Sequence, residues 1–331
     1  MSDQITLAVK YRPTTFEDVC GQESIRIILT NQLKNNTFKH SYLFTGPAGC
    51  GKTTCARIFA NEINKGVGNP IEMDAASNSG VDDVRNITQQ AKTQSLDSEY
   101  KVFIIDECHS ISNTGWQAFL KLIEEPPLKS IFIFCTTNPE KIPKTILSRV
   151  QRYDFTRLPD NIIIDRLKYV CSKEQISIDD DALNFISFRA DGGMRDGLTY
   201  LDKTISYNQF PITTDIVVSA LGLISYDIML NLLRSIIQKD ISLIVNCIED
   251  LYLQGYDLKL FLSDLTVFIL EVIKYLYNIE TRVISPNFAV KLQNLDVVKV
   301  KEVLSLLLQL NNDIKYQVNP HYYIEAFLIN S

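Results

Sequence analysis

Residues 41–53 read SYLFTGPAGCGKT, and the last eight of them fit the pattern G-x-x-x-x-G-K-[S/T]. An apolar strand is predicted before the pattern and a helix, TTCARIFANEI (53–63), after it, and in this context the pattern binds phosphate. Backbone N–H groups of such a loop surround phosphate oxygens, Lys52 reaches the β- and γ-phosphates, and the Thr53 hydroxyl binds Mg²⁺. A glycine-rich turn that fits the pattern by chance is the disfavoured alternative. The predicted nucleotide-binding residues of this loop are Gly46, Ala48, Gly49, Cys50, Gly51, Lys52, Thr53 and Thr54.

A second apolar run, VFIID (102–106), ends in two carboxylates, Asp106 and Glu107. Buried acids are costly unless they have partners, so a function at this strand end is favoured over simple helix capping. Asp106 is predicted to hold the metal, and Glu107 to polarise the water that attacks the γ-phosphate. Thr137 follows another apolar strand, and we expect its hydroxyl to orient the same water; the alternative is a simple turn.

The first half of the chain alternates strands and helices. Strands are predicted at 41–46, 71–75, 101–107 and 130–138, with a possible fifth at 151–156. Their apolar runs lack a clean alternation of polar residues, which is typical of a parallel sheet covered on both faces. A helix that includes WQAFLKLIEE (116–125) must end before Pro126 and Pro127. The predicted fold of this half is a doubly wound α/β domain.

No further strand pattern follows residue 158. Three short helices are predicted at 160–175, 179–190 and 194–208, and apolar residues recur at helical spacing from about 225 to the end. We therefore expect three domains: an α/β base domain (1–157), a helical lid (158–224) and an all-α collar domain (225–331).

Charge is distributed unevenly along the chain. The formal net charge is −6, but residues 1–157 are balanced at +1, and the acidity lies in the remainder. Any contact with DNA must therefore be a local feature of the first half. No apolar run reaches the roughly 18 residues of a membrane span, and the N-terminus lacks the apolar stretch of a secretory signal. A cytoplasmic location is predicted, with association with the nucleoid during replication.

Seven cysteines are scattered without a C-x-x-C pair, so we expect buried, reduced thiols and no disulfide framework. Arg149, in ILSRV, and Arg195, in GGMRDGL, have side chains suited to phosphate charge, because the guanidinium is planar and stays protonated. An arbitrary arginine is usually a surface residue, and these two gain weight only from the resemblance described next.

Several stretches together resemble the gamma/tau (motor) subunit of bacterial DNA polymerase III clamp loaders, which belong to the AAA+ ATPases. They are KYRPTTFEDVCGQE (10–23), HSYLFTGPAGCGKTTCARIFA (40–60), DAASNSGVDDVRNI (74–87), IIDECHSISNTGWQAFLKLIEEPP (104–127), TTNPEKIPKTILSR (136–149) and GGMRDGLTYLDK (192–203). The likeness spans nearly the whole chain, and LYLQGYDLKLFLSDL (251–265) is its weaker C-terminal part.

The resemblance implies an ATP- and Mg²⁺-dependent ATPase that opens a sliding clamp and loads it onto primer-template DNA. Its partners would be the clamp, the primer-template DNA and other loader subunits, in a pentameric hetero-oligomer. Thr137 would be sensor 1, Arg195 sensor 2, and Arg149 an arginine finger for a neighbouring subunit. Residues implied near the adenine are Tyr11, Arg12, Pro13 and Val19. Residues implied at the DNA backbone are Asn78, Ser79, Arg85, Asn113 and Thr114, whose phosphate contacts are blind to sequence.

The chain departs from the family in three ways. The usual four-cysteine zinc module is replaced by NEINKGVGNP (61–70), so no zinc is expected. Val150 stands where the finger motif ends in cysteine. The chain stops after the third predicted domain, as a short form without the tau extension.

Two other functions stay open. A branch-migration AAA+ motor would carry a winged helix as its third domain, which the all-helical pattern after 225 disfavours. A structural loader subunit that does not hydrolyse ATP would usually lack Lys52, Glu107 or the sensor residues, and all of these are present.

Overall fold

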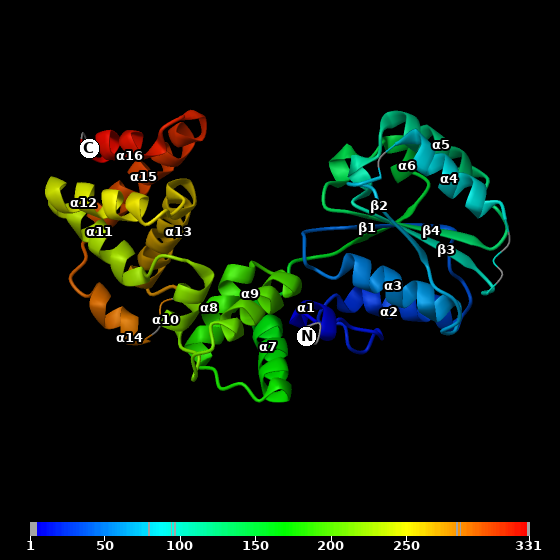
Figure 1. Ribbon diagram of the computed structural model, residues 1–331, viewed down its shortest axis with the longest axis horizontal. Coiled ribbons are helices and arrows are strands. Elements are labelled where there is room, and N and C mark those ends of the chain that lie inside the picture. Colours follow the sequence, from blue (N-terminus) through cyan, green and yellow to red (C-terminus); the bar gives the residue numbers. More distant parts are fainter. Residues whose placement is uncertain are drawn as a thin grey trace. The chain divides into compact units, whose positions relative to one another are not determined.

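The structure is a computed structural model that describes residues 5–78, 80–93, 95, 97–282, 284 and 286–329. The chain divides into two compact units, shown with their elements in Figure 1. The sheet-containing unit comprises Met1–Gln175 and Arg189–Asp202, and the all-helical unit comprises Ile176–Phe188 and Lys203–Ser331. This division runs through the residues expected to form the lid, 158–224.

Five parallel strands form one sheet in the order β2-β3-β4-β1-β5. They are β1 (Ser41–Thr45), β2 (Ile71–Asp74), β3 (Lys101–Asp106), β4 (Ser130–Thr136) and β5 (Gln151–Asp154). The predicted α/β fold is confirmed, including its fifth strand. Each strand ends one or two residues before its predicted limit, where the chain turns into a polar loop at the carboxyl edge of the sheet.

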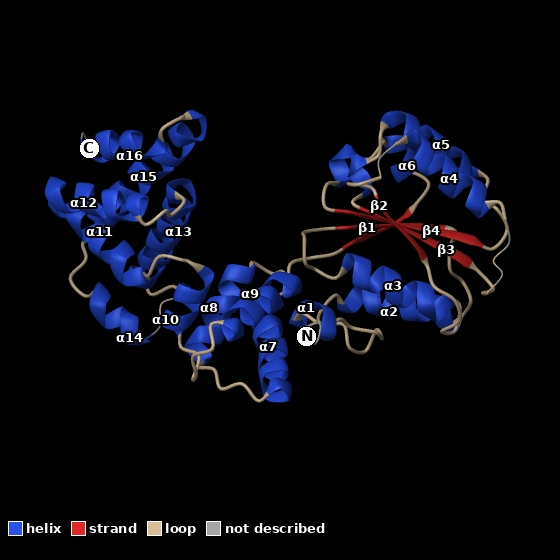
Figure 2. Cartoon of the chain, in the orientation of Figure 1, coloured by secondary structure: helices blue, strands red, loops and turns tan. Residues whose placement is uncertain are grey.

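Helices cover both faces of this sheet, as Figure 2 shows. α2 (Glu23–Lys34) and α3 (Lys52–Ile63) lie on one face, and α4 (Val81–Ala91), α5 (Asn113–Glu124) and the short α6 (Lys144–Leu147) lie on the other. Successive residues of β1 serve opposite cores: Tyr42 and Phe44 pack with α3, and Leu43 packs with the α4–α5 side. Burial on both faces is why the strands show no polar alternation.

Aromatic side chains dominate the core on the α4–α5 side. Phe103, Phe132 and Phe134 line the sheet, and Trp116 and Phe119 of α5 pack against them with ring centroids 5.2–6.3 Å apart. Offset and edge-on aromatic pairs of this kind add to the free energy of burial. These contacts hold the first half of α5 to the sheet.

The rest of the described chain is helical. The α7, α8 and α9 helices span Asp160–Glu174, Asp180–Ala190 and Met194–Ser206, close to their predicted limits. The remaining elements are α10 (Thr214–Leu221), α11 (Tyr226–Gln238), α12 (Ile241–Leu253), α13 (Leu258–Leu276), α14 (Pro286–Ala289), α15 (Val297–Asp313) and α16 (Pro320–Ile329). Five of them begin at a side-chain cap, from Thr213, Ser225, Asp240, Asp257 and Asp296.

The core of the all-helical unit is built around α13, whose residues Leu262, Leu265 and Ile269 are fully buried. Beyond β5, the described part of the chain contains one isolated bridge, Ile178 with Ile212, and no strand. Within the same part, no single helix is long and apolar enough to cross a membrane; α10 and α11 reach that length and composition only as a pair, bent by 84°.

The two-sided core predicts a large difference between two Leu→Ala substitutions. Leu122, on α5, is 3% exposed, and Leu128, in the following loop, is 95% exposed. Leu122→Ala should lower the free energy of unfolding of the sheet-containing unit by about 2–5 kcal/mol, because it leaves a cavity. Leu128→Ala, the matched control, should change it by less than about 0.5 kcal/mol. Denaturant unfolding measures both, and equal effects would contradict the packing described.

Candidate functional site

The phosphate loop connects β1 to α3 and has the backbone that its glycines allow. Gly46, Gly49 and Gly51 have φ values of 141°, 71° and 97°, in the region that side chains other than glycine rarely adopt. A Cβ on Gly46 would lie 2.3 Å from the carbonyl oxygen of Phe155. This close approach ties the start of the loop to the end of β5.

Lys52, the first residue of α3, is only 6% exposed. Its Nζ donates hydrogen bonds of 2.8 Å to the carbonyl oxygens of Gly46 and Pro47. The ammonium group is thus held against the loop at the start of α3. Burial of a lysine is costly without such partners, so the position favours a charged ligand.

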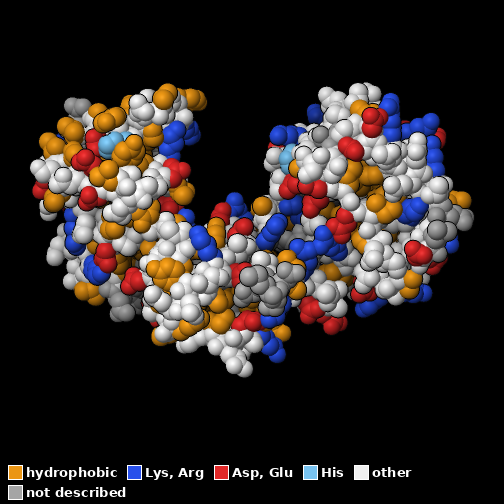
Figure 3. All heavy atoms as spheres, in the orientation of Figure 1, with side chains coloured by type: hydrophobic (Ala, Val, Ile, Leu, Met, Phe, Trp, Pro, Cys, Tyr) orange, Lys and Arg blue, Asp and Glu red, His pale blue; other side chains and the backbone are white. Residues whose placement is uncertain are grey.

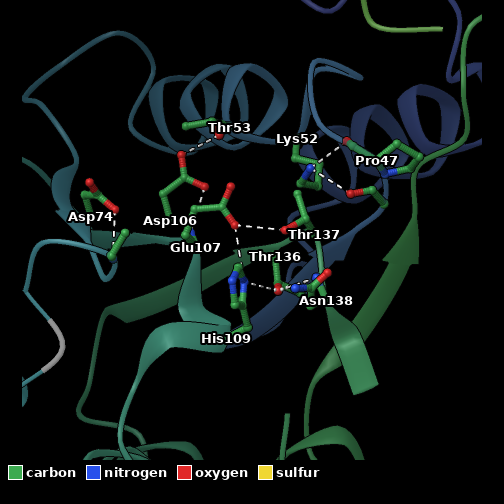
Figure 4. Close-up of polar contacts among 12 residues, drawn as sticks. Pro47, Lys52, Thr53, Asp74, Asp106, Glu107, His109, Thr136, Thr137 and Asn138 are labelled. Carbon is green, nitrogen blue, oxygen red and sulfur yellow. Dashed lines mark hydrogen bonds and ion pairs between the residues drawn. The ribbon is translucent and has the colours of Figure 1, made fainter. Parts of the chain in front are cut away.

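Thr53 and Asp106 meet across the sheet edge. The Thr53 Oγ1 donates to Asp106 Oδ2 at 2.7 Å, and Asp106 Oδ1 accepts from the backbone N–H of Glu107 at 3.0 Å (Figure 4). A hydroxyl beside a carboxylate is an all-oxygen donor set, which fits Mg²⁺. These two side chains are the ones that could hold the ion beside a nucleotide.

The Glu107 carboxylate is fixed by side chains from two other segments. Its Oε2 accepts from Thr137 Oγ1 at 3.2 Å and lies 3.3 Å from Nδ1 of His109 (Figure 4). Glu107 itself has a φ of 45°, an uncommon backbone conformation that directs the residue out of the strand. The structure therefore brings Glu107 and Thr137 together, and adds His109, which the sequence analysis had not singled out.

A cavity of about 370 Å³ opens beside the loop. Of the predicted residues, it is lined by Tyr11, Arg12, Pro13, Val19, Ala48, Gly49, Cys50, Gly51, Lys52, Thr53, Thr54, Asp106, Glu107 and Arg195. Its lining also includes residues that the sequence analysis did not single out: Ala8, Cys20, Arg57, Leu158, Arg166, Met194 and Leu198. Gly46, Thr137 and Arg149 are outside the lining, although Gly46 starts the loop and Thr137 contacts Glu107.

The N-terminus of α9 packs directly on the phosphate loop. Met194 donates its N–H to the Gly49 carbonyl at 3.1 Å, and a Cβ on Gly49 would lie 3.0 Å from the Cα of Gly193. Glycines on both sides permit this approach, which explains the GGM sequence before the helix. Arg195 is carried to the cavity by the same contact.

Positive charges converge on the cavity. Burial, and then the nearby charges of Arg57 and Arg195, lower the pKa of the Arg12 guanidinium. Cations that repel one another at a cavity wall favour a polyanionic ligand, whose charge relieves the repulsion. The effect is local, because Lys and Arg are interspersed with Asp and Glu over the face seen in Figure 3.

Tyr11 is held by α7. Its hydroxyl donates to the Glu174 carboxylate, and Arg166 Nη2 donates to its carbonyl oxygen at 2.9 Å. Burial, together with the hydrogen bond to Glu174, raises the pKa of Tyr11 to about 12, so its hydroxyl stays protonated. The ring also packs edge-on against Tyr169. These contacts orient the N-terminal wall of the cavity.

Arg149 lies apart from the cavity, just after α6. Its side chain is 40% exposed, and its Nε is 2.9 Å from Glu124 Oε1 of α5. Its Nη1 also donates to the Thr145 carbonyl oxygen at 2.8 Å. Within this chain the guanidinium therefore faces a surface acid.

The residues that the family resemblance places at the DNA backbone lie around the starts of α4 and α5. Asn78 bonds the Asp74 carbonyl, exposed Arg85 pairs with Asp82, and the Thr114 hydroxyl bonds that of Ser112 beside Asn113. The two helix starts are neighbours, since a Cβ on Gly115 would lie 3.3 Å from Val84. Ser79 lies outside the described residues.

All seven cysteines are free; five are buried, whereas Cys20 and Cys247 are partly exposed, so the expectation of burial was wrong for these two. Burial raises the pKa of the Cys55 thiol to about 12 and that of the Cys171 thiol to about 11. No group of three or more His, Cys, Asp or Glu side chains suited to a metal occurs among the residues that the structure describes.

Three family models match successive parts of the chain. They are the DNA polymerase III delta subunit over residues 69–159, the DNA polymerase III clamp loader subunit ATPase lid domain over 162–209, and domain III of DNA polymerase III subunits gamma and tau over 212–330.

Curated relatives carry the same assignment. The chain is 34% identical to DNA polymerase III subunit tau of Bacillus subtilis, over 96% of this chain and 62% of that protein. It is 36% identical to subunit gamma/tau of Mycobacterium tuberculosis H37Rv over 77% of this chain and 48% of the relative. The matches thus span less than two thirds of each relative's length.

Among solved structures, the chain is similar to the RuvB Holliday junction branch migration motor of Thermotoga maritima. The TM-score is 0.55 at 20% identity, over 69% of this chain and 79% of that one. This likeness shows the shared fold alone, whereas the three family models and the two bacterial relatives above are named for DNA polymerase III. The chain belongs to the gamma/tau family of DNA polymerase III clamp-loader subunits.

Proposed function

We propose that this chain is the motor subunit of a clamp loader, which uses ATP hydrolysis to open a sliding clamp and place it on primer-template DNA. The observation that carries the proposal is the meeting of the buried Lys52, the Thr53–Asp106 pair and the Glu107–Thr137 pair at one sheet edge. This arrangement is suited to phosphoryl transfer to water. The subunit would act in the cytoplasm, at the nucleoid, with other loader subunits in a pentameric ring.

Each side chain at the edge has a distinct task in this proposal. Lys52 binds the β- and γ-phosphates, and Thr53 and Asp106 hold Mg²⁺, which neutralises phosphate charge when bound. Glu107 accepts a proton from the attacking water, and Thr137 fixes the carboxylate that does so. Tyr11, Arg12, Pro13 and Val19 supply the wall for the adenine, and zinc has no part.

Coupling to the clamp and DNA requires that ATP favour one arrangement of subunits over another. Arg195, on α9, would sense the γ-phosphate within the chain, and Arg149 would reach the nucleotide of a neighbouring subunit. Contacts that exist only with the γ-phosphate are lost on hydrolysis, so the DNA-gripping arrangement would be released. A subunit that binds ATP without hydrolysing it is disfavoured, because Glu107 and Thr137 are both in place.

The division of tasks predicts that two substitutions fail at different steps. Glu107→Gln should bind ATP normally and lower turnover by about 10²- to 10⁴-fold, because the proton acceptor is lost. Lys52→Ala should instead lose ATP binding. Nucleotide binding and ATP turnover, measured separately on both variants, decide the assignment. Normal turnover by Glu107→Gln would show that Glu107 has no such role.

Arg149 is predicted to act in trans. Arg149→Ala should keep ATP binding in its own subunit but lower turnover by about 10³- to 10⁵-fold in an assembly of such subunits, because an arginine finger stabilises transition-state charge. Glu124→Gln is the control: if Arg149 only pairs with this surface acid, both variants should behave alike.

Mixing gives the decisive measurement for Arg149. Arg149→Ala and Lys52→Ala subunits, each inactive alone, would form boundaries that combine an intact ATP site with an intact finger. Part of the activity should return. A mixture that stays inactive although mixed assemblies are shown to form would exclude the trans role.

DNA binding is predicted to need ATP and to ignore sequence. Binding to phosphates releases counterions, so the logarithm of affinity should fall linearly with the logarithm of salt concentration. Arg85→Ala should reduce that slope by about one. Arg152→Ala, a surface arginine that is likewise paired with an acid but lies at the opposite edge of the sheet, should leave it unchanged. Tight binding without nucleotide or partners would contradict the model.

A further inference from the structure

His109 lies on the 3₁₀ turn η1 (Cys108–Ser110), which leaves β3 directly after Glu107. Its side chain is 17% exposed, and its Nδ1 is 3.3 Å from Glu107 Oε2 and 3.1 Å from Thr136 Oγ1. Figure 4 shows the imidazole beneath the Glu107 carboxylate, between that group and the end of β4. The ring therefore connects the acid at the end of β3 to the end of the neighbouring strand.

The contact with Glu107 indicates which ring nitrogen of His109 bears the hydrogen. The lone pair of an unprotonated nitrogen would be repelled by an ionised carboxylate oxygen at this distance, so Nδ1 bears the hydrogen. The hydrogen bond of Nδ1 is to Thr136 Oγ1, and the same nitrogen lies 3.3 Å from Glu107 Oε2, the oxygen that accepts from the Thr137 hydroxyl. Oε2 thus has one hydroxyl donor and the imidazole N–H edge beside it.

Thr136 holds the ring through the same nitrogen, Nδ1. This residue is fully buried, and its Oγ1 accepts the backbone N–H of Asn138 at 3.0 Å. The hydroxyl next to Nδ1 is therefore anchored to the backbone of the loop that carries Thr137. His109 and Thr137 reach Glu107 from a single supported segment.

Burial alone does not orient the Glu107 side chain, which is 37% exposed. A partly exposed glutamate has several rotamers of similar energy. Every rotamer other than the productive one moves the carboxylate away from the water that would attack the γ-phosphate. The hydrogen bond from Thr137 to Oε2 and the close contact with the His109 ring are what restrict it.

We propose that His109 is a positioning residue for ATP hydrolysis: its ring, hydrogen-bonded to Thr136 through Nδ1, holds the Glu107 carboxylate by close electrostatic contact where it can accept the proton of the attacking water. The proposal rests on the proposed function, in which Glu107 performs that step. His109 touches neither nucleotide nor water in this role.

Two substitutions separate positioning from mere packing. His109→Asn places an amide Nδ2 where the imidazole Nδ1 stood, whereas His109→Gln moves the amide one bond further out. We expect His109→Ala and His109→Gln to lower kcat for ATP by roughly 10- to 100-fold, with KM and the Kd for ATP unchanged. His109→Asn should recover most of the turnover. Rates are measured with clamp and primed DNA, in the assembly that gives the maximal wild-type rate.

His40 supplies a matched control. Its Nδ1 is also 3.1 Å from an oxygen, the Ser130 carbonyl oxygen, but His40 lies at the amino ends of β1 and β4, away from the site at their carboxyl ends. His40→Asn should leave turnover unchanged. Thermal unfolding of every variant identifies loss of folding, and if His109→Ala is unstable the Asn and Gln variants still decide.

A double substitution distinguishes failure of this proposal from failure of the proposed function. With Glu107→Gln present, His109→Ala should add no further loss, because it acts through that carboxylate. Wild-type turnover by Glu107→Gln alone would refute the proposed function. An inactive Glu107→Gln together with unchanged or raised kcat in His109→Ala, a change confined to KM, or equal rates for the Asn and Gln variants would overturn only the positioning role.

Discussion

The parallel pairing of β1, β3 and β4 is the constraint on which the site depends. Thr45 lies opposite Thr136, and Ile105 opposite Phe134, so the three strands end at the same edge. The residues that follow each strand must then meet, whatever their separation in sequence. The phosphate loop, the Asp106–Glu107 pair and Thr137 are neighbours for this reason, and the two aromatic and aliphatic cores keep the strands in register.

The charge beside the carboxyl edge of the sheet is locally positive, although the net charge of the molecule is negative. The chain carries a formal charge of −6, yet Lys52 is buried in the loop and Arg12, Arg57 and Arg195 converge on the cavity beside it. Such a concentration of cations is unfavourable by itself and would become favourable with a polyanionic ligand such as the proposed nucleotide. Ligand binding and the local order of α9 on the loop are therefore expected to support each other.

The carboxylate of Glu107 illustrates how orientation is achieved at a half-exposed position. An unusual backbone conformation takes the residue out of the strand, and a hydroxyl donor from the residue after β4 and the imidazole on η1 then restrict its side chain. The same logic holds for Tyr11, whose hydroxyl and carbonyl are both bound by α7. In each case a functional group is held by segments distant in sequence rather than by its own element.

The amino-acid sequence by itself determined the elements and the motifs, because both depend on spacing within short segments. Uninterrupted apolar runs mark doubly covered strands, and the glycines of the loop are needed wherever φ is positive. Only the tertiary structure decided which distant side chains complete the site, such as Arg166, Met194 and His109, and that Arg149 faces Glu124. Those contacts depend on which distant segments pack against the carboxyl edge of the sheet and on how far each side chain reaches. A pattern within a short segment of sequence contains neither kind of information.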